Sequence, residues 1–436
     1  MRTNDPQAIL DREPMSRAQW AVVAVMVGLN ALDGFDVLSI SFASPGIARD
    51  WGIDRGALGF VLSMELIGMA VGSLALGGFA DRMGRRVTIL TCLGIMTAGM
   101  LGAASAGDVY QLSGWRLFTG LGIGGMLAAT NAAVAEAAND RRRALCVVLM
   151  AAGYPVGTIV GGSISAVLLA NYGWQSVFLF GAVASACFVP IVLLAAPESI
   201  AFLVHKRPPD ALAKINRSLA RMGHATIDSL PERAVAKPKT SAIDLFSAAL
   251  RRKTVLLTLA YLAHIMTFYF ILKWIPKIVV DMGHAPSAAA GVLVWASAGG
   301  AAGSLLLGLL TSRVKLLPLT IGAMLGSVAL VILFGRGGSD IATLSYLAAA
   351  AGFATNAGVV GLYALVARSF PTGLRATATG FVIGIGRGGS ALAPAVAGLL
   401  FAAGYPLSTV AILMALGSAV GALALFGLAS RKASAS

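Results

Sequence analysis

The chain alternates between long apolar stretches and short polar segments, and twelve of the apolar stretches are long enough to cross a membrane. A helix needs about 20 mostly apolar residues to span the hydrocarbon core of a bilayer. The predicted spans cover residues 19–44, 56–80, 87–106, 110–137, 144–170, 174–196, 254–280, 287–311, 316–335, 341–368, 374–402 and 406–429. One long hydrophilic segment separates the sixth span from the seventh. The pattern therefore predicts an all-α integral membrane protein with twelve transmembrane helices in two six-helix bundles.

This pattern divides the chain into three parts. Residues 1–196 are predicted to form an N-terminal six-helix bundle, 197–253 a cytoplasmic linker and 254–436 a C-terminal six-helix bundle. The spacing of Ala, Leu, Lys and Arg after Pro197 is typical of one or two amphipathic helices that lie near the membrane surface. Residues 230–244 are predicted to be a flexible connection.

Composition supports a membrane protein and disfavours most soluble classes. Of the 436 residues, 57% are hydrophobic and 12% charged, whereas soluble proteins carry about 25% charged residues. The three cysteines and four histidines show no metal-ligand spacing, so no metal site is expected. No constellation of a nucleophile and a base suggests an enzyme, and no cofactor is predicted.

The distribution of basic residues predicts the orientation. Of the 33 Lys and Arg residues, 26 lie at the two termini and in alternate loops, and four lie in the opposite loops. Cytoplasmic loops carry the excess of Lys and Arg. We therefore expect both termini to face the cytoplasm in a multi-pass protein of the inner (plasma) membrane. The net charge of +14 is then a topology signal, and nucleic-acid binding is not expected.

The two halves carry traces of an internal repeat at a constant offset of 231 residues. The aligned positions are Leu76, Gly77 and Arg82 with Leu307, Gly308 and Arg313, and Gly153 and Gly157 with Gly384 and Gly388. Two parallel halves joined by a linker are the plan of a transporter that rocks around a central site.

Two aspartates in the first span are candidates for proton coupling. Asp33 and Asp36 lie three residues apart and share one helix face. A charge at the bilayer centre costs at least about 2.5–3.5 kcal/mol, so such residues usually face a cavity or a partner and mark ion or substrate paths. Two neighbouring carboxylates repel when both are ionised, which favours a proton on one of them. The alternative is an ion pair that locks the helix to a basic residue of a neighbouring span.

A third acidic residue and an arginine lie inside other spans of the first half. Arg116 in the fourth span could pair with an aspartate, bind substrate, or switch between the two as protonation changes. Glu65 in the second span is either a further proton site or the partner of Arg116. The sequence does not choose between these alternatives.

Arg387 lies about halfway along the eleventh span, in a half of the protein that has few acidic residues. The spans of that half contain no acid apart from the peripheral Asp281 and Asp340. The planar guanidinium suits a carboxylate with two parallel hydrogen bonds. This asymmetry predicts an anionic substrate, and the alternative is a bond to backbone carbonyl groups or a pair that crosses between the halves.

Lys273 lies in the outer part of the seventh span, next to aromatic residues. It either binds substrate or extends its ammonium group to the membrane surface. Tyr269, Trp274 and, in the first span, Phe35 are candidates for stacking on a ring-bearing substrate. Packing or a position at the membrane interface is the alternative for these rings.

The stretch between spans 2 and 3 carries clustered charges. It lacks the GK[ST] and the preceding strand of a phosphate-binding loop, but its charges lie between two helix ends, where they can interact with the helix dipoles. We expect a breakable ion network that controls gating. Its candidate residues are Gly77, Asp81, Arg82, Gly84, Arg85 and Arg86. The basic run 141–143 in the next loop of this side is interpreted as a topology anchor.

Taken together, these motifs resemble the major facilitator superfamily. GGFADRMGRR at 77–86 resembles its signature between spans 2 and 3, and Arg116 with the glycines after it resembles its span 4 signature. DGFDVLSISFASPGIARDWGI, which begins at Asp33, is similar to the first span of the aromatic acid:proton symporter family with its Asp-Gly-x-Asp motif. PESIAFL after the sixth span and GIGRGGSALAP in the eleventh are similar to that family too. The resemblance covers nearly the whole chain.

The resemblance implies proton-driven import of an aromatic carboxylate, such as a benzoate or hydroxybenzoate, by alternating access. Asp33 and Asp36 match the family's required aspartates, Arg116 and Arg387 match its arginines in spans 4 and 11, and the 77–86 residues named above match its gating loop. Lys273 departs from the family, which has an uncharged residue before Trp-x-Pro.

The expected partners are a small anionic substrate, protons and the bilayer, without nucleic acid or an obligatory protein partner. Two alternatives are a symporter of a non-aromatic carboxylate and a proton-driven exporter of amphipathic compounds. The stretch GYPVG at 153–157 lacks the following proline that marks drug:proton antiporters, which disfavours export.

Overall fold

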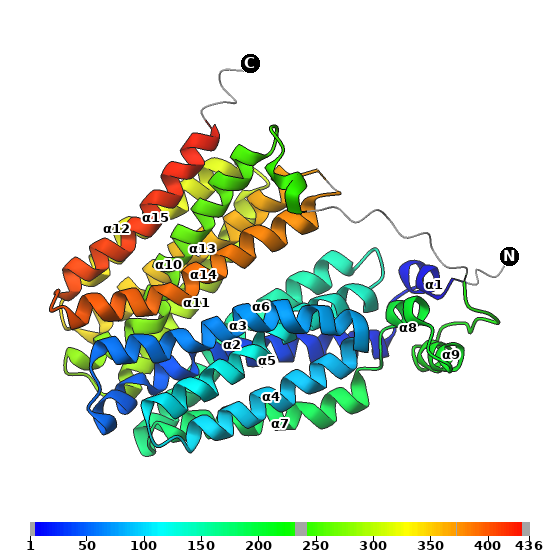
Figure 1. Ribbon diagram of the computed structural model, residues 1–436, viewed down its shortest axis with the longest axis horizontal. Helices are drawn as coiled ribbons and strands as arrows, with labels where there is room; N and C mark the ends of the chain where they lie inside the picture. The colour runs from blue at the N-terminus through cyan, green and yellow to red at the C-terminus, as the bar shows by residue number, and fades with distance from the viewer. Residues whose placement is uncertain (1–4, 232–241, 372, 430–436) are drawn as a thin grey trace.

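The computed structural model describes residues 5–231, 242–371 and 373–429 (Figure 1). Over these residues the secondary structure is helical, with fifteen α-helices and one short 3₁₀ helix and without a strand. Twelve of the helices are long and apolar enough to cross a membrane. The fold class predicted from the sequence is confirmed.

Six long helices lie on each side of the linker. The N-terminal six are α2 (Arg17–Trp51), α3 (Arg55–Met83), α4 (Arg85–Ala104), α5 (Val109–Ala137), α6 (Arg143–Asn171) and α7 (Gln175–Ala195). The C-terminal six are α10 (Arg251–Asp281), α11 (Pro286–Leu310), α12 (Leu316–Arg336), α13 (Ile341–Ser369), α14 (Arg375–Ala402) and α15 (Leu407–Ala429). The predicted spans match these helices to within a few residues, except that α2 continues through Pro45 to Trp51.

The helix ends define two faces of the molecule. One face, which we call the linker face, carries both chain ends and the segment between α7 and α10. The opposite face carries the short loops 52–54, 105–108, 172–174, 282–285, 337–340 and 403–406, and we call it the short-loop face. Side chains of Asp54, Asp108 and Asp340 cap α3, α5 and α13 at this face by accepting backbone N–H bonds.

The two bundles repeat one packing scheme. α3 packs against α5 and against α14 of the other bundle, just as α11 packs against α13 and against α6 of the other bundle. α2 packs against α6, and α10 against α14. The repeated glycines contribute unequally, however. Gly153 and Gly157 pack against the backbone of α2, whereas a Cβ at Gly384 or Gly388 would meet no atom of the described chain within 4 Å.

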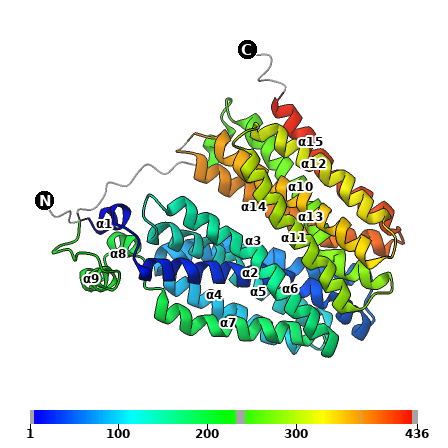
Figure 2. The same ribbon diagram turned by 180° about the vertical axis from the view of Figure 1, so that it is seen from behind.

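The bundles meet near the short-loop face and diverge toward the linker face (Figures 1 and 2). Gly59 of α3 lies so close to α14 that a Cβ there would approach the Pro394 carbonyl oxygen to 2.6 Å. At the same end, Arg55 Nη2 of α3 forms an ion pair with Asp281 Oδ2 of α10 at 2.9 Å. Toward the linker face, Leu74 of α3 is 81% exposed. The structure is therefore closed at the short-loop face and open toward the linker face.

The predicted amphipathic helices of the linker are α8 (Ile200–Lys206) and α9 (Ala211–Arg221), and a 3₁₀ helix, η1 (Ala242–Phe246), follows. α8 and α9 bury their apolar sides in a small separate core with α1 (Pro6–Arg12). These sides are thus covered by protein. Of the predicted flexible connection at 230–244, residues 232–241 lie outside the described part of the chain.

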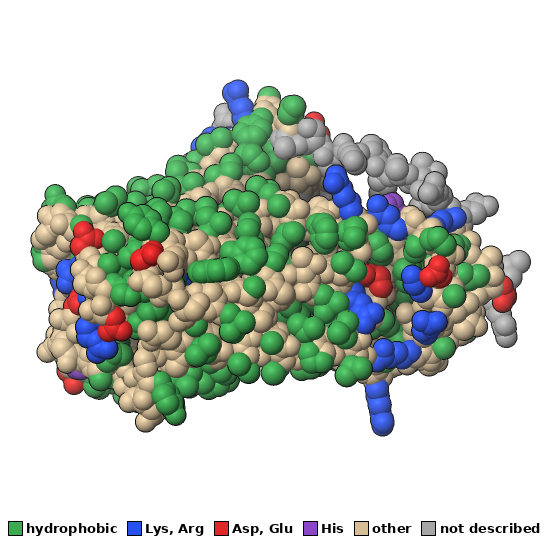
Figure 3. Space-filling view, turned by 60° about the horizontal axis from the view of Figure 1, so that its bottom comes forward, with side chains coloured by type: hydrophobic (Ala, Val, Ile, Leu, Met, Phe, Trp, Pro, Cys, Tyr) green, Lys and Arg blue, Asp and Glu red, His purple; other side chains and the backbone are tan. Residues whose placement is uncertain are grey.

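The surface agrees with a membrane-spanning protein. Figure 3 shows charged side chains gathered toward the two ends of the molecule, with a broad band of hydrophobic and uncharged side chains between them on the face in view.

Candidate substrate and proton site

Five charged side chains from four helices are buried together in the short-loop half of the molecule. They are Asp33 and Asp36 of α2, Glu65 of α3, Arg116 of α5 and Lys273 of α10, and none is more than 2% exposed. We call these five residues the buried charge cluster. Four of them belong to the N-terminal bundle, and Lys273 reaches in from the C-terminal bundle.

Glu65 holds two cations of the buried charge cluster. Its Oε1 pairs with Arg116 Nη2, and its Oε2 accepts a hydrogen bond from Lys273 Nζ at 3.1 Å. The sequence left open whether Glu65 is the partner of Arg116, and in this structure it is. Lys273 is 0% exposed and also donates to the Val37 carbonyl oxygen of α2. It therefore does not extend to the membrane surface.

The hydrogen bond from Arg116 to Asp36 goes to the backbone carbonyl and not to the carboxyl group. Its Nη2 donates to the Asp36 carbonyl oxygen at 3.0 Å, and its Nη1 lies 3.2 Å from Met100 Sδ. The guanidinium carbon lies 5.4 Å from the centre of the Phe178 ring. Among the described residues, the carboxylate partner of Arg116 is Glu65, and the pairing with an aspartate side chain considered from the sequence is not found here.

The Asp33 and Asp36 side chains form the second part of the buried charge cluster. Their four carboxyl oxygens are buried, and none has a hydrogen-bond partner within the described chain. Gly34 between them allows α2 to contact α6 closely, because a Cβ at this position would lie 2.1 Å from the Tyr154 carbonyl oxygen. Asp33 and Asp36 thus differ from Glu65, whose charge is matched by two cations.

Arg387 of α14 also crosses between the bundles. Its Nη1 donates to the Met69 carbonyl oxygen of α3 at 3.0 Å, and its side chain is partly buried. This is the backbone contact that the sequence offered as the alternative to substrate binding. One such contact leaves other N–H donors of the guanidinium for a ligand.

Tyrosines that the sequence analysis did not single out surround this region. The hydroxyl groups of Tyr261 and Tyr363 lie 3.0 Å apart, and Tyr261 is within electrostatic range of Arg387. Tyr154 of α6 is within range of Glu65 and Asp33. Tyr261 and the predicted Tyr269 lie eight residues apart on α10, a spacing that keeps both on one side of a helix and could have indicated them together.

The three aromatic residues predicted to stack on substrate are placed differently. Tyr269 is partly buried and lies within electrostatic range of Arg387 and Glu65. Phe35 is 3% exposed and packs edge-on against Phe180 at 5.1 Å. Trp274 is fully buried and donates to the Pro394 carbonyl oxygen at 3.2 Å. In this structure Phe35 and Trp274 therefore pack against protein, whereas Tyr269 keeps part of its surface accessible.

The predicted gating stretch is mostly helical. α3 extends to Met83 and includes Gly77, Asp81 and Arg82, so only Gly84 separates it from α4. Arg85 forms ion pairs with Asp81 at 3.2 Å and with Glu136 of α5 at 2.9 Å. Arg86 Nη2 donates to the Leu193 carbonyl oxygen of α7 at 2.6 Å. These contacts stay within the N-terminal half.

Glu198 is a residue of this network that the sequence analysis did not identify. Its Oε1 accepts the backbone N–H of Arg85 at 2.8 Å and that of Arg86 at 3.4 Å. A carboxylate at this position satisfies free N–H groups at the start of α4 and interacts favourably with the helix dipole. Glu198 belongs to the PESIAFL stretch, which the sequence analysis noted only as a resemblance.

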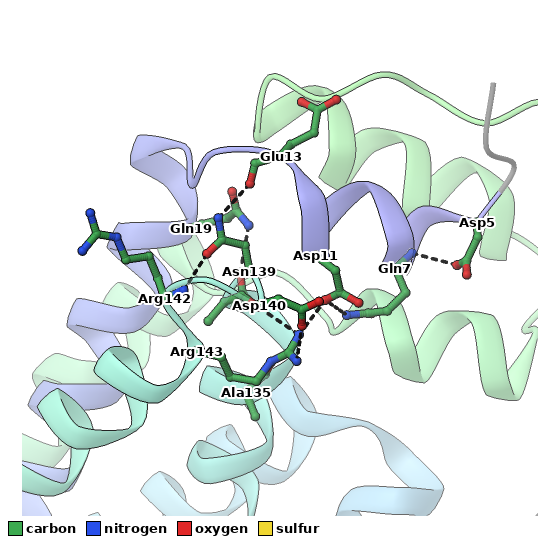
Figure 4. Close-up of polar contacts among 12 residues, drawn as sticks. Asp5, Gln7, Asp11, Glu13, Gln19, Ala135, Asn139, Asp140, Arg142 and Arg143 are labelled. Atoms are coloured by element: carbon green, nitrogen blue, oxygen red, sulfur yellow. Dashed lines mark hydrogen bonds and ion pairs between the residues drawn. The ribbon is translucent and has the colours of Figure 1, made fainter. Parts of the chain in front are cut away.

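The basic run 141–143 does more than mark topology. Arg143 bonds to Asp11 of α1 at 2.5 Å, to Asp140 at 2.6 Å and to the Ala135 carbonyl oxygen at 3.0 Å (Figure 4). It therefore ties α1 to the loop between α5 and α6 at the linker face.

Comparison with known proteins identifies the family. A sequence profile described as Major Facilitator Superfamily matches residues 26–346, which is more than half of the chain. The chain belongs to the major facilitator superfamily. It is a transporter and not an enzyme.

Relatives of this major facilitator are named as transporters of aromatic acids. The chain is 30% identical to the gallate transporter of Pseudomonas putida over 422 residues, which cover 95% of this chain and 93% of that protein. It is 29% identical to the 4-hydroxybenzoate transporter PcaK of Acinetobacter baylyi over 429 residues, with 97% and 93% covered. It is 30% identical to the 3-(3-hydroxy-phenyl)propionate transporter of Escherichia coli over 433 residues, with 99% and 98% covered.

Solved structures share the major facilitator fold. A crystal structure of a D-xylose-proton symporter has a TM-score of 0.71 at 18% identity, over 93% of this chain and 96% of that chain. The inward open conformation of the xylose transporter XylE from E. coli has a TM-score of 0.71 at 17% identity, over 94% and 95%.

Proposed function

We propose that this major facilitator is a symporter that imports a small aromatic carboxylate, of the benzoate or hydroxybenzoate kind, together with protons. The names of three relatives that align over nearly the whole chain support an aromatic acid as substrate. The excess of Lys and Arg at the linker face supports a cytoplasmic position of that face in the inner membrane. Substrate would then enter from the short-loop face and leave at the linker face.

The observation that carries proton coupling is the pair of aspartates without hydrogen-bond partners. An ionised carboxylate buried without a donor is costly, whereas the protonated group is not. Asp33 and Asp36 therefore carry the coupling proton. Glu65 instead pairs with Arg116 and Lys273, so we assign it a structural role rather than proton transfer.

While the protein is open at the linker face, as in this structure, the substrate carboxylate binds at Arg387, and its ring lies among the tyrosines around that residue. Arg387 belongs to a bundle with few acids and has donors beyond its contact with Met69. The Tyr261 ring packs against Gly386, the residue before Arg387, and its hydroxyl group lies 3.0 Å from that of Tyr363. Tyrosine offers both a ring face for stacking and a hydroxyl group for a substituent on the substrate ring.

The test is uptake by purified protein in liposomes with an imposed inward proton gradient. Labelled benzoates, hydroxybenzoates and non-aromatic dicarboxylates are offered in parallel, with a protonophore as the control. We expect uptake of an aromatic acid that collapses with the protonophore. Uptake of non-aromatic acids alone would overturn the substrate class, and absence of any acid uptake would favour an exporter.

A further inference from the structure

The ion pair between Lys273 and Glu65 crosses the boundary between the bundles. Lys273 lies on α10. Its two partners belong to the other bundle, Glu65 on α3 and Val37 on α2. Both charged side chains are fully buried. Because the bundles meet at the short-loop face, any motion that opens this face moves α10 away from α2 and α3 and must break these bonds.

When the pair breaks, Glu65 still has a charged partner, whereas Lys273 does not. Glu65 keeps Arg116, which belongs to the same bundle. Lys273 has no second acidic partner in its own bundle, because the sequence from residue 254 onward contains only Asp281 and Asp340 as acidic residues. Asp281 is already paired with Arg55 and Lys277, and Asp340 caps α13.

A buried ammonium group without a counter-ion is strongly unfavourable. Opening of the short-loop face separates Lys273 from Glu65 and makes the ammonium group accessible to an anion that enters from that face. We propose that Lys273 exchanges Glu65 for the carboxylate of the substrate when this face opens. Glu65 and the substrate carboxylate then compete for Lys273. While no substrate is bound, the pair of Glu65 with Lys273 keeps the short-loop face closed. The identity of the anion rests on the proposed function. Closure of the short-loop face by the pair of Lys273 and Glu65, which we call the latch, does not.

The surroundings of Lys273 fit an aromatic carboxylate. Tyr269 lies four residues earlier on α10, so the two side chains are on one side of the helix. Tyr269 therefore offers an aromatic ring on the side of α10 from which Lys273 extends.

Two variants with opposite expected effects test the exchange. Binding of benzoate and of 4-hydroxybenzoate to the purified full-length protein is measured by calorimetry. Lys273→Met removes the site for the carboxylate and should weaken binding by about thirtyfold or more. Glu65→Gln removes the competitor and should strengthen binding, because less of the protein is held in the state that cannot bind. Lys273→Arg keeps the charge and should recover most of the affinity.

A matched control is Lys277→Met, one turn further along α10. Lys277 pairs with Asp281 near the surface and does not enter the buried charge cluster, so binding should stay close to wild type. If Lys273→Met and Glu65→Gln both weaken binding, or if Lys277→Met weakens it as much as Lys273→Met, the exchange is wrong.

The latch is tested without any substrate by measuring the distance between the bundles. Spin labels at Tyr110→Cys and Tyr405→Cys lie on opposite bundles at the short-loop face, and both native side chains are exposed, by 84% and 48%. Cys187 is exposed and is replaced by Ser, while Cys92 and Cys146 are buried. Lys273→Met and Glu65→Gln should shift the distances to longer values, and Lys273→Arg should not.

The binding measurement tests the exchange with a carboxylate, and the label distances test the latch. Unchanged label distances in both charge-removing variants would overturn the latch. A wild-type protein that binds neither probe would contradict the proposed function and the exchange with a carboxylate. The label distances would then still decide whether Lys273 and Glu65 hold the short-loop face closed.

Discussion

At the scale of single residues, the buried charge cluster separates two kinds of carboxylate. Glu65 is neutralised by two cations, whereas the Asp33 and Asp36 carboxyl groups have no donor within the described chain. Burial without a donor favours the protonated form, and this difference is the reason why we propose the aspartates as carriers of the coupling proton.

We predict that Asp33→Asn and Asp36→Asn each abolish accumulation driven by a proton gradient. An amide cannot take up or release a proton, but it preserves the shape of the side chain, so exchange of labelled for unlabelled substrate should continue. Both activities are measured in the same liposomes. Asp54→Asn is the control, because asparagine caps a helix as well as aspartate. Proton-driven accumulation by either of the first two variants would contradict the assignment.

Arg387 gives a second prediction at this scale. Arg387→Gln should weaken binding of 4-hydroxybenzoate by about thirtyfold or more, because a charge-assisted contact is lost. Arg387→Lys should restore only part of the affinity, because lysine cannot make two parallel bonds to a carboxylate. The control Arg375→Gln lies on the same helix at the exposed linker end. Equal losses in Arg387→Gln and Arg375→Gln would contradict a specific carboxylate contact.

The sequence predicted the members of the buried charge cluster and offered the pair of Glu65 with Arg116 as one alternative, but it did not predict the pair of Glu65 with Lys273. Apolar surroundings marked Asp33, Asp36, Glu65, Arg116 and Lys273 as unusual, because charges are rare inside spans. Lys273 and Glu65 lie 208 residues apart, and helical periodicity describes the faces of one helix without saying which helix lies opposite. For the same reason the sequence does not choose between stacking and packing for Phe35 and Trp274, because the rings Phe180 and Phe401 that contact them come from distant helices.

At the scale of elements, the junction between α3 and α4 depends on one glycine. Gly84 has φ +103, and a Cβ there would lie 2.3 Å from Glu198 Oε2. A side chain would therefore be strained by the backbone and would displace the carboxylate that caps α4. The sequence predicted that the second span ends near residue 80, whereas α3 continues as a helix to Met83.

We predict that Gly84→Ala destabilises the protein by about 1–3 kcal/mol. Gly78→Ala, six residues earlier, is the matched control, because a Cβ there would meet no described atom within 4 Å, and alanine favours a helix by up to about 1 kcal/mol over glycine. Thermal unfolding in detergent measures both. A smaller loss for Gly84→Ala than for Gly78→Ala would show that the junction does not need glycine.

The cap of α13 gives a pH-dependent prediction. Hydrogen bonds from Thr343 hold the pKa of Asp340 below its usual value of 3.8. A carboxyl group with a lowered pKa in the folded protein adds stability above its unfolded pKa and loses this contribution as the pH falls through the folded value. Asp340→Ala should therefore lower the Tm at pH 7, and the difference from wild type should shrink toward pH 3. A difference that does not depend on pH would contradict this account of the cap.

At the scale of the whole molecule, the hydrophobic pattern predicted twelve spans and two groups of six, and the charge pattern marked one face of the molecule. Neither pattern contains the relative tilt of the bundles. That the bundles meet at the short-loop face and diverge at the linker face follows from contacts such as Gly59 with Pro394 and Arg55 with Asp281, which join distant parts of the chain.

The central claim is that movement of an aromatic acid and movement of protons are one event. The most direct test places a pH dye inside liposomes that contain the protein and adds 4-hydroxybenzoate outside, without a pH gradient. The account predicts acidification of the interior that begins with substrate entry and disappears in Asp36→Asn. If labelled substrate enters the liposomes that contain the wild-type protein while the internal pH stays constant, the central claim is wrong.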